Sequence, residues 1–135
     1  MKVGHHVDWV ILAVLSSVFS LGVGLSPTRG DDAPSMVDVF VSGTEGYHTY
    51  RIPGIVLTEQ GTLLAFCEGR KTGRSDHGDL DLVLRRSSDG GKTWQPMQLV
   101  YEEGGTAKIT IGNPCPVVDR TTGTIWLLMT WLCYQ

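Results

Sequence analysis

One stretch, Ser87 to Trp94, constrains the fold of this chain more than any other part of the sequence. It reads Ser-Ser-Asp-Gly-Gly-Lys-Thr-Trp and has the form S-x-D-x-G-x-T-W. Hydroxyl and carboxylate side chains can hydrogen-bond the backbone amides of a tight turn, here expected two residues on, and two successive glycines permit positive φ. The indole can fold beneath the turn and pack between sheets. We therefore interpret this stretch as a structural hairpin turn and assign Asp89 no catalytic role. The turn residues are Ser87, Asp89, Gly91, Thr93 and Trp94.

Short apolar segments separated by turn residues fill most of the sequence after residue 37. Many of the 17 glycines fall between these segments, and outside the N-terminus no useful length has a helical period. This pattern predicts an all-β meander, in which four consecutive strands form one sheet. The run 125–129 is apolar throughout, which is typical of a strand buried on both faces. The expected strands are 37–41, 52–58, 62–68, 80–86, 97–101 and 124–132, with weaker candidates at 108–111 and 116–119.

The N-terminal residues 1–30 are typical of an export signal and a linker. Lys2 precedes an apolar run at 10–21 that suits a signal peptide and is short for a membrane span. We expect cleavage between Gly22 and Asp31 and a protein that is secreted, periplasmic or on the cell surface. The alternative is an uncleaved signal anchor, the one route by which we expect contact with a membrane.

Three cysteines, Cys67, Cys115 and Cys133, are an odd number for an exported chain. None has the spacing of a metal site or a redox pair. Each lies in or beside an apolar run, so we expect buried, inert thiols, with a disulfide to a residue outside this sequence as the alternative. The formal net charge of −3 and the lack of a basic stripe exclude nucleic acid as an expected partner.

Arg51 is the first candidate functional residue, because it stands at the start of an apolar strand. A guanidinium group can bind a carboxylate through two parallel hydrogen bonds, and at the inner end of a strand it requires an anionic partner. One interpretation is that Arg51 binds the carboxylate of a substrate. The alternative is a buried salt bridge with Glu68 or another acid.

The glycine-rich loop that follows residue 67 mixes acids and bases. An aspartate there can act as a general acid if burial or neighbouring negative charge raises its pKa. The spacing of Asp76, Asp79 and Asp81 does not match a calcium loop, so we expect no metal ion and no cofactor. His77 is interpreted as a loop residue.

Several segments together resemble the exo-α-sialidases (neuraminidases) of the bacterial and animal sialidase family. The resemblance runs from about Val37 to Trp131, and its segments occur in the family's order and spacing. They are Tyr50–Pro53, Leu64–Arg70, Ser75–Asp76, Asp81–Ser87, the S-x-D-x-G-x-T-W box and Asn113–Pro116. The resemblance implies an all-β fold that is part of a six-bladed β-propeller. Residues 37–135 would form its N-terminal part, about the first one to two blades.

The same resemblance implies roles for individual residues. Arg51 would be the first of three arginines that hold the carboxylate of sialic acid, Arg70 would line the pocket near the sugar's 4-hydroxyl, and Asp76 would be the general acid/base. The turn would be one of the family's Asp-boxes (BNR repeats). The nucleophilic tyrosine, its glutamate and two further arginines are expected beyond Gln135, so we expect the isolated chain to be inactive.

The implied function is hydrolysis of terminal sialic acids with retention of configuration. The expected partners are sialylated glycoproteins, glycolipids or oligosaccharides. Two alternatives stay open at this stage. One is a non-catalytic propeller that binds glycans or proteins, which would have no reason to keep Arg51, Arg70 and Asp76 together. The other is a transferase that passes the sugar to a second glycan.

Overall fold

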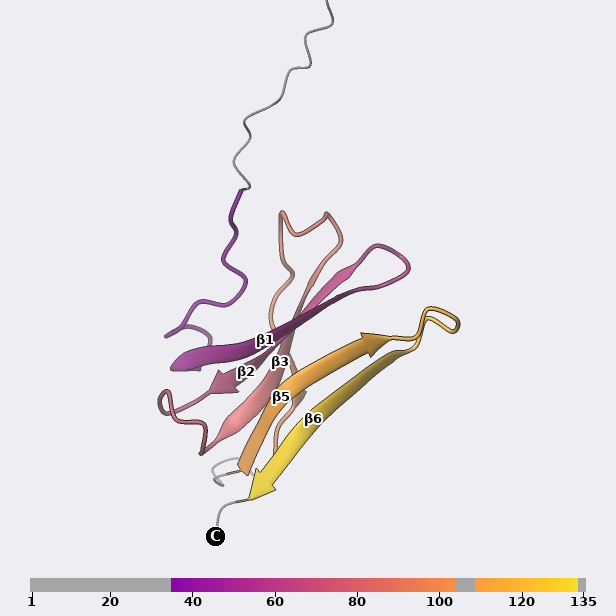
Figure 1. Ribbon diagram of the computed structural model, residues 1–135. Helices are drawn as coiled ribbons and strands as arrows, with labels where there is room; N and C mark the ends of the chain where they lie inside the picture. The colour runs from indigo at the N-terminus through magenta and orange to yellow at the C-terminus, as the bar shows by residue number, and fades with distance from the viewer. Residues whose placement is uncertain (1–34, 104–108, 134–135) are drawn as a thin grey trace, which may run out of the picture. The chain divides into compact units, whose positions relative to one another are not determined.

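The computed structural model describes residues 35–103 and 109–133, which form six strands (Figure 1). Residues 1–34 lie outside the described part, and with them the expected export signal and its cleavage site. In the described ranges no helix is long and apolar enough to cross a membrane. The strands are β1 (Thr49–Leu57), β2 (Leu63–Arg70), β3 (Leu80–Ser87), β4 (Gln98–Tyr101), β5 (Ile109–Val118) and β6 (Ile125–Cys133).

The strands form an antiparallel meander followed by a hairpin. β1 pairs with β2, β2 with β3 and β3 with β4, all antiparallel. β5 and β6 make an antiparallel pair that joins the first sheet where Leu80 of β3 meets Thr110 of β5 in parallel register. The expected four consecutive strands are therefore present, and β5 and β6 join them in one six-stranded sheet.

Three expectations about strands need correction. Residues 37–41 alternate in polarity but form no strand, and Thr44 turns back to hydrogen-bond the carbonyl of Val41. The two weak candidates at 108–111 and 116–119 belong to one continuous strand, β5. In the apolar run of β6 only Ile125 and Leu127 are partly buried, because that strand packs on one face alone.

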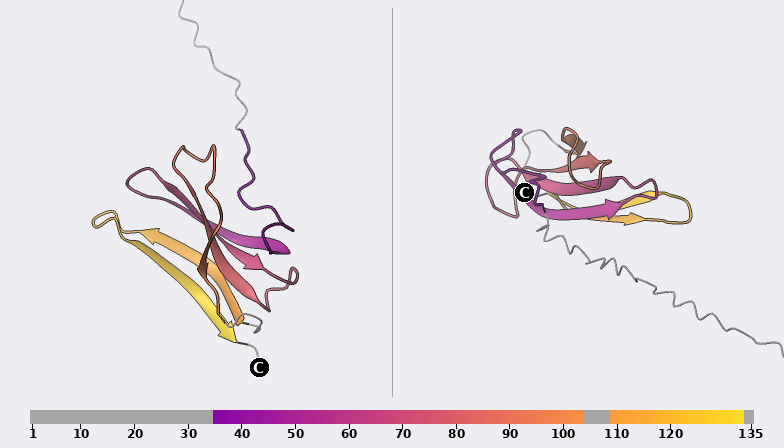
Figure 2. Two further views of the ribbon diagram at one scale, coloured as in Figure 1. Left: turned by 180° about the vertical axis from the view of Figure 1, so that it is seen from behind. Right: turned by 90° about the horizontal axis from the view of Figure 1, so that it is seen from above.

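The hydrophobic core residues come from the first sheet and the β5–β6 hairpin, whose ribbons are seen from two further sides in Figure 2. Burial of these aliphatic and aromatic side chains supplies the main favourable free energy of folding. On the other side of β2, the ring of Tyr47 lies against Gly69, where a Cβ would overlap it. β2 is thus covered on both faces and β6 on one. The core residues are Leu64, Phe66, Leu82, Leu84 and Ile111, with Val56, Ile109, Ile125 and Leu127 packed against them.

A β-bulge interrupts both β1 and β5 at an X-Pro step. The register shifts between Arg51 and Gly54 in β1, and between Gly112 and Cys115 in β5. The residue before each proline has positive φ, 55° at Ile52 and 52° at Asn113. Bulges bend a strand and redirect its side chains, and here both lie beside the candidate site.

The turn after β3 is held by its own side chains. The Ser87 hydroxyl donates to Asp89 Oδ1 at 2.8 Å and accepts the amide of Gly91 at 2.9 Å. Asp89 accepts both the amide and the hydroxyl of Thr93, four residues on and not two as expected. These bonds hold the pKa of Asp89 well below its usual range. The indole of Trp94 donates to the Gly91 carbonyl at 3.2 Å.

The three cysteine thiols are free, but they differ in exposure. Cys67 is buried and donates to the carbonyl of Arg51 at 3.0 Å. Burial raises the pKa of this thiol to about 12, so it is inert at neutral pH. Cys115 and Cys133 are exposed, and the expectation that they are buried is wrong. Cys115 lies on β5, and Cys133 ends β6, where every residue from Leu128 onward is exposed.

Candidate functional site

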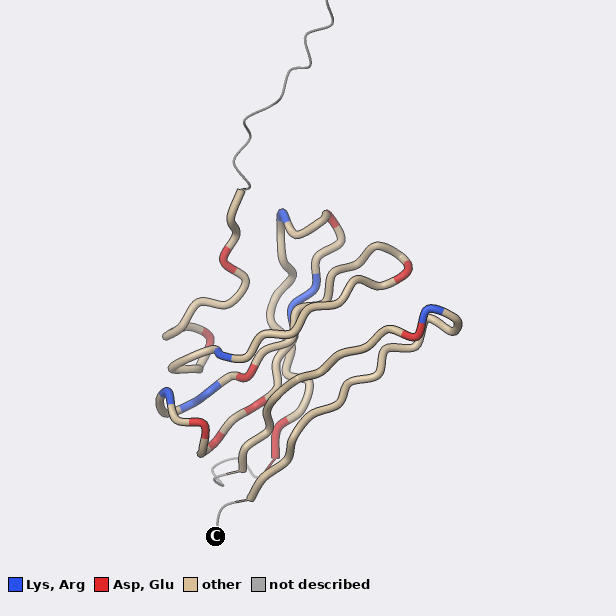
Figure 3. The backbone as a smooth tube through the Cα atoms, viewed as in Figure 1, with Lys and Arg blue, Asp and Glu red and all other residues tan. Residues whose placement is uncertain are grey.

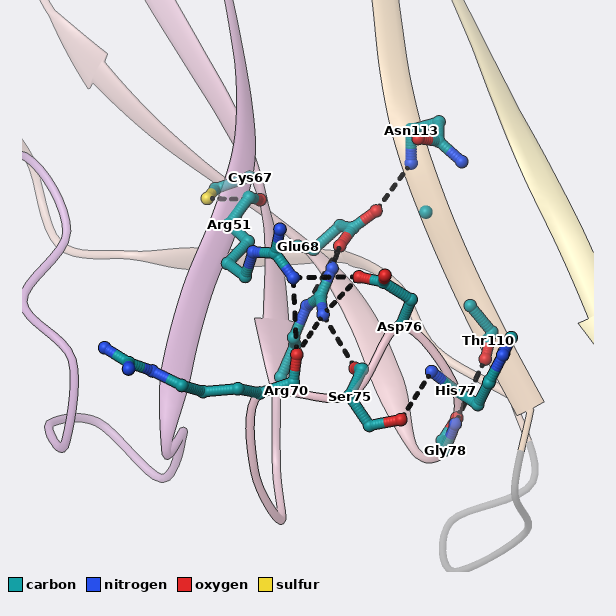
Figure 4. A network of polar contacts seen from close by, with 12 residues as sticks. Arg51, Cys67, Glu68, Arg70, Ser75, Asp76, His77, Gly78, Thr110 and Asn113 are labelled. Carbon is teal, nitrogen blue, oxygen red and sulfur yellow. Dashed lines mark hydrogen bonds and ion pairs between the residues drawn. The ribbon is translucent and has the colours of Figure 1, made fainter.

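The candidate site is a cavity of about 320 Å³ where β1, β2, β5 and the loop between β2 and β3 meet (Figure 4). It contains the three residues that the sequence singled out for binding and catalysis. It is lined by Arg51, Ile52, Glu68, Arg70, Asp76, Thr110 and Asn113.

Arg51 reaches the cavity from β1, directly before the bulge. Its Nη1 donates to Asp76 Oδ1 at 2.9 Å and to the carbonyl of Arg74 at 3.3 Å. The side chains of Arg51 and Asp76 are 44% and 68% exposed. Arg51 therefore does pair with an acid, as the alternative expected, but the acid is Asp76 and the pair is exposed, not buried. An exposed ion pair contributes at most about 1 kcal/mol, so an incoming anion can replace Asp76 at low energetic expense.

Arg70 lies at the end of β2 and is buried, with 2% of its side chain exposed. Its Nη1 donates at 2.7 Å to three acceptors in the following loop, the carbonyls of Arg74 and Ser75 and Oδ1 of Asp76. Its other edge pairs with Glu68. Arg70 thus holds the loop that carries Asp76 and also lines the cavity.

Asp76 lies between the two arginines and accepts from both through the same oxygen, Oδ1. The hydrogen bond from Arg70, reinforced by the charge of Arg51, holds the pKa of this carboxyl below its usual range. A general acid needs the opposite shift. In this arrangement Asp76 is ionised at neutral pH and acts as an internal carboxylate ligand of the two arginines.

The other acids of the loop region have a different partner. Asp79 and Asp81 both pair with Lys71 Nζ, at 3.1 and 3.2 Å. Asp81 also accepts the hydroxyl of Tyr47 at 2.7 Å. Within the described residues no group of three or more acids, histidines or cysteines could hold a metal ion.

Most of this chain is similar in sequence to curated sialidases. It is 42% identical over 101 residues to a sialidase of Micromonospora viridifaciens, a match that covers 74% of this chain. It is 40% identical over 104 residues to an exo-alpha-sialidase of Arthroderma benhamiae, and 41% identical over 90 residues to sialidase-2 of Mus musculus. These matches cover 75% and 61% of this chain. No family model matches the sequence.

The fold gives the same result as the sequence. The solved structure of Hadza microbial sialidase Hz136 matches 68% of this chain with a TM-score of 0.63 and 32% identity. The chain is a sialidase-family sequence. Its all-β fold is part of a β-propeller, as the resemblance implied. The chain spans 16%, 25% and 22% of the three curated relatives and 19% of the solved structure.

Four of the seven lining residues were not assigned a place in the cavity from the sequence: Ile52, Glu68, Thr110 and Asn113. Glu68 was considered as a partner for Arg51 and as part of a family segment, and Asn113 only as part of a family segment. The structure places Glu68 Oε1 2.9 Å from the backbone nitrogen of Asn113. The repeated X-Pro step, Ile52-Pro53 and Asn113-Pro114, was the available signal, since each step begins the bulge that turns toward the cavity.

Proposed function

We propose that this chain carries the carboxylate-binding part of an exo-α-sialidase site, which takes terminal sialic acids. The observation that carries the proposal is the half-exposed guanidinium of Arg51, which faces the cavity and already binds a carboxylate, that of Asp76. The similarity to proteins named sialidases supports the choice of sialic acid among anionic ligands.

The arrangement suggests how binding and acid catalysis are linked. A substrate carboxylate that pairs with Arg51 replaces Asp76 there, and Asp76 loses a hydrogen bond that stabilises its ionised form. The bound anion then adds negative charge close to Asp76, which raises the pKa of a carboxyl group. Asp76 becomes able to protonate the leaving oxygen and later to activate water, while Arg70 keeps its loop in place.

The finer parts of the proposal rest on the sequence. The proposed substrates are sialosides on glycoproteins, glycolipids or oligosaccharides. The apolar run at 10–21 supports export, with the site acting outside the cytoplasm. No residue of this chain is assigned as the nucleophile.

The test is a titration of the 135-residue chain with N-acetylneuraminic acid, followed by NMR at the arginine side chains. We expect shifts at Arg51, and Arg51→Ala should weaken binding about tenfold or more, since a charged hydrogen bond is lost. Arg86→Ala is the matched control, because Arg86 is exposed on β3 and pairs with Gln98. The methyl ester of the same sugar should bind weakly. Equal binding of acid and ester would contradict the proposal.

A second candidate, a propeller that binds sialosides without hydrolysing them, is favoured by the lowered pKa of Asp76. The two functions differ in what the ligand does to that carboxyl. For a hydrolase, bound sialic acid should raise the pKa of Asp76, measured by ¹³C NMR of its Cγ. For a binding protein, Asp76 stays ionised with ligand bound. Release of fluorophore from a fluorogenic sialoside would decide directly for the hydrolase.

A further inference from the structure

Glu68 is a buried carboxylate at the junction between the first sheet and the β5–β6 hairpin. It lies on β2, its side chain is 4% exposed, and it points across the junction toward β5 (Figure 4). Burying a charged group is unfavourable by several kcal/mol unless it is paired and hydrogen-bonded. The groups that pair with Glu68 therefore indicate what role the buried carboxylate has.

Each carboxylate oxygen of Glu68 has its own partner. Oε2 accepts two hydrogen bonds from Arg70, from Nε at 3.1 Å and Nη2 at 2.5 Å. Oε1 accepts the backbone amide of Asn113 at 2.9 Å. Because the guanidinium is planar, two of its donors that converge on one oxygen restrict its orientation. The third donor, Nη1, is then directed at Asp76 and its loop.

The β5 side of this contact is shaped to receive the carboxylate. Gly112 leaves open the space that Oε1 occupies, and a Cβ at this position would overlap it. Asn113 follows with a φ of 52°, a conformation that few residues other than glycine adopt as readily as asparagine. The bare backbone and the left-handed turn together present an amide to Glu68.

We propose that Glu68 is a positioning residue for the anion site: it orients the guanidinium of Arg70 toward Asp76 and couples that orientation to the turn at Asn113. The inference deepens the proposed function, because the group it orients lies beside the proposed carboxylate position. We assign Glu68 no direct bond to the ligand, because its side chain is 4% exposed and both of its carboxylate oxygens already have donors. Its effect reaches the site through Arg70 and through the loop that carries Asp76.

The experiment is Glu68→Gln in the full 135-residue chain, with the pKa of Asp76 measured by ¹³C NMR and no sugar present. The glutamine oxygen can still accept the Asn113 amide, but its NH₂ group cannot accept from Arg70. We expect Arg70 to turn away from Asp76, whose pKa should rise toward its ordinary value of about 4. The Nε resonance of Arg70 should shift at the same time.

Thr130→Val is the matched control, since Thr130 donates to Gly112 and accepts from Asn113 at the same junction without touching Glu68. It should lower stability and leave the pKa of Asp76 unchanged. If Glu68 served stability alone, Glu68→Gln would behave like this control, or the pKa of Asp76 would fall further. Either result overturns the inference.

Gly112→Ala keeps the experiment decisive if Glu68→Gln does not fold. Its Cβ displaces the carboxylate without removing the charge. The pKa of Asp76 should rise in this variant too, and an unchanged value overturns the inference. Neither measurement uses sialic acid, so a chain that binds none can still confirm the positioning. A chain that binds sialic acid but fails these tests contradicts the positioning alone.

Discussion

The β1–β2 and β5–β6 strand pairs share one backbone construction. In the first pair Arg51 faces Glu68 and the register slips by one residue before Gly54 faces Phe66. In the second, Gly112 faces Thr130 and the same slip comes before Cys115 faces Leu128. Both slips occur at an X-Pro step with positive φ. The bulge is therefore a structural feature that the two strand pairs share, and both copies line the same cavity.

The two pairs differ in the side chains that this backbone presents. Where the first has Arg51, Glu68 and Arg70, the equivalent register positions of the second hold glycine, threonine and leucine. β5 and β6 carry no charged residue along their length, and the charges appear only at the turn between them (Figure 3). The two strand pairs therefore have the same bulged backbone, and only the first carries charged side chains that can bind an anion.

The largest expected effect comes from the difference in burial between the two strand pairs. Phe66 and Leu128 hold equivalent register positions, but Phe66 is 4% exposed and Leu128 is 60% exposed. We expect Phe66→Ala to lower the free energy of unfolding by about 3–5 kcal/mol. Leu128→Ala should change it by less than about 0.5 kcal/mol. Urea unfolding of both variants measures the difference, and similar losses would mean that β6 is covered in solution.

Backbone strain gives the next test, since both bulges need a left-handed residue but only one has asparagine. A β-branched residue in this conformation is disfavoured by about 1–2 kcal/mol. Ile52→Asn should therefore raise the free energy of unfolding by about 1 kcal/mol, and Asn113→Ile should lower it by about as much. Ile55→Asn is the control, because Ile55 is exposed on the same strand outside the bulge. If Ile55→Asn also raised the free energy of unfolding, the effect of Ile52→Asn could not be attributed to relief of backbone strain.

The smallest expected effect is a pH dependence that separates the two hairpin turns. Asp119 accepts the Thr121 amide and the Thr122 hydroxyl, which lower the pKa of its carboxyl. The stability it contributes is present above the unfolded value of about 3.9 and is lost as pH falls through its lower folded pKa. The β1–β2 turn uses the uncharged hydroxyl of Thr58 as its acceptor.

Amide exchange measured from about pH 5 down to about pH 2 should therefore show the β5–β6 turn opening first, after correction for intrinsic rates. Asp119→Asn should remove most of this pH dependence. If both turns lose protection together, global unfolding and not Asp119 is responsible.

The strand positions could be predicted from the sequence to within a few residues, and the exceptions have physical causes. The gap between the two candidates for β5 contains Pro114, and a proline disfavours a continuous strand because it lacks an amide donor. The structure keeps one strand by placing the bulge there. Residues 37–41 alternate correctly for a strand, but alternation does not specify whether a neighbouring strand is available to pair.

The candidate site could be predicted only in part. Arg51, Arg70 and Asp76 were identified from the sequence and meet at one cavity. The partner of Arg51 and the direction of the Asp76 pKa shift were not. Both depend on where Arg70 points, and that depends on Glu68 and on Asn113, 45 residues further along the chain.

By itself the sequence determined the turns, the strand periods and the residue types that can bind a carboxylate, because each depends on a few neighbouring residues. Only the tertiary structure decided which charges meet, which cysteines are buried and which face of each hairpin is covered. Those outcomes depend on which strands lie side by side, and in a sheet such contacts join residues far apart in the chain.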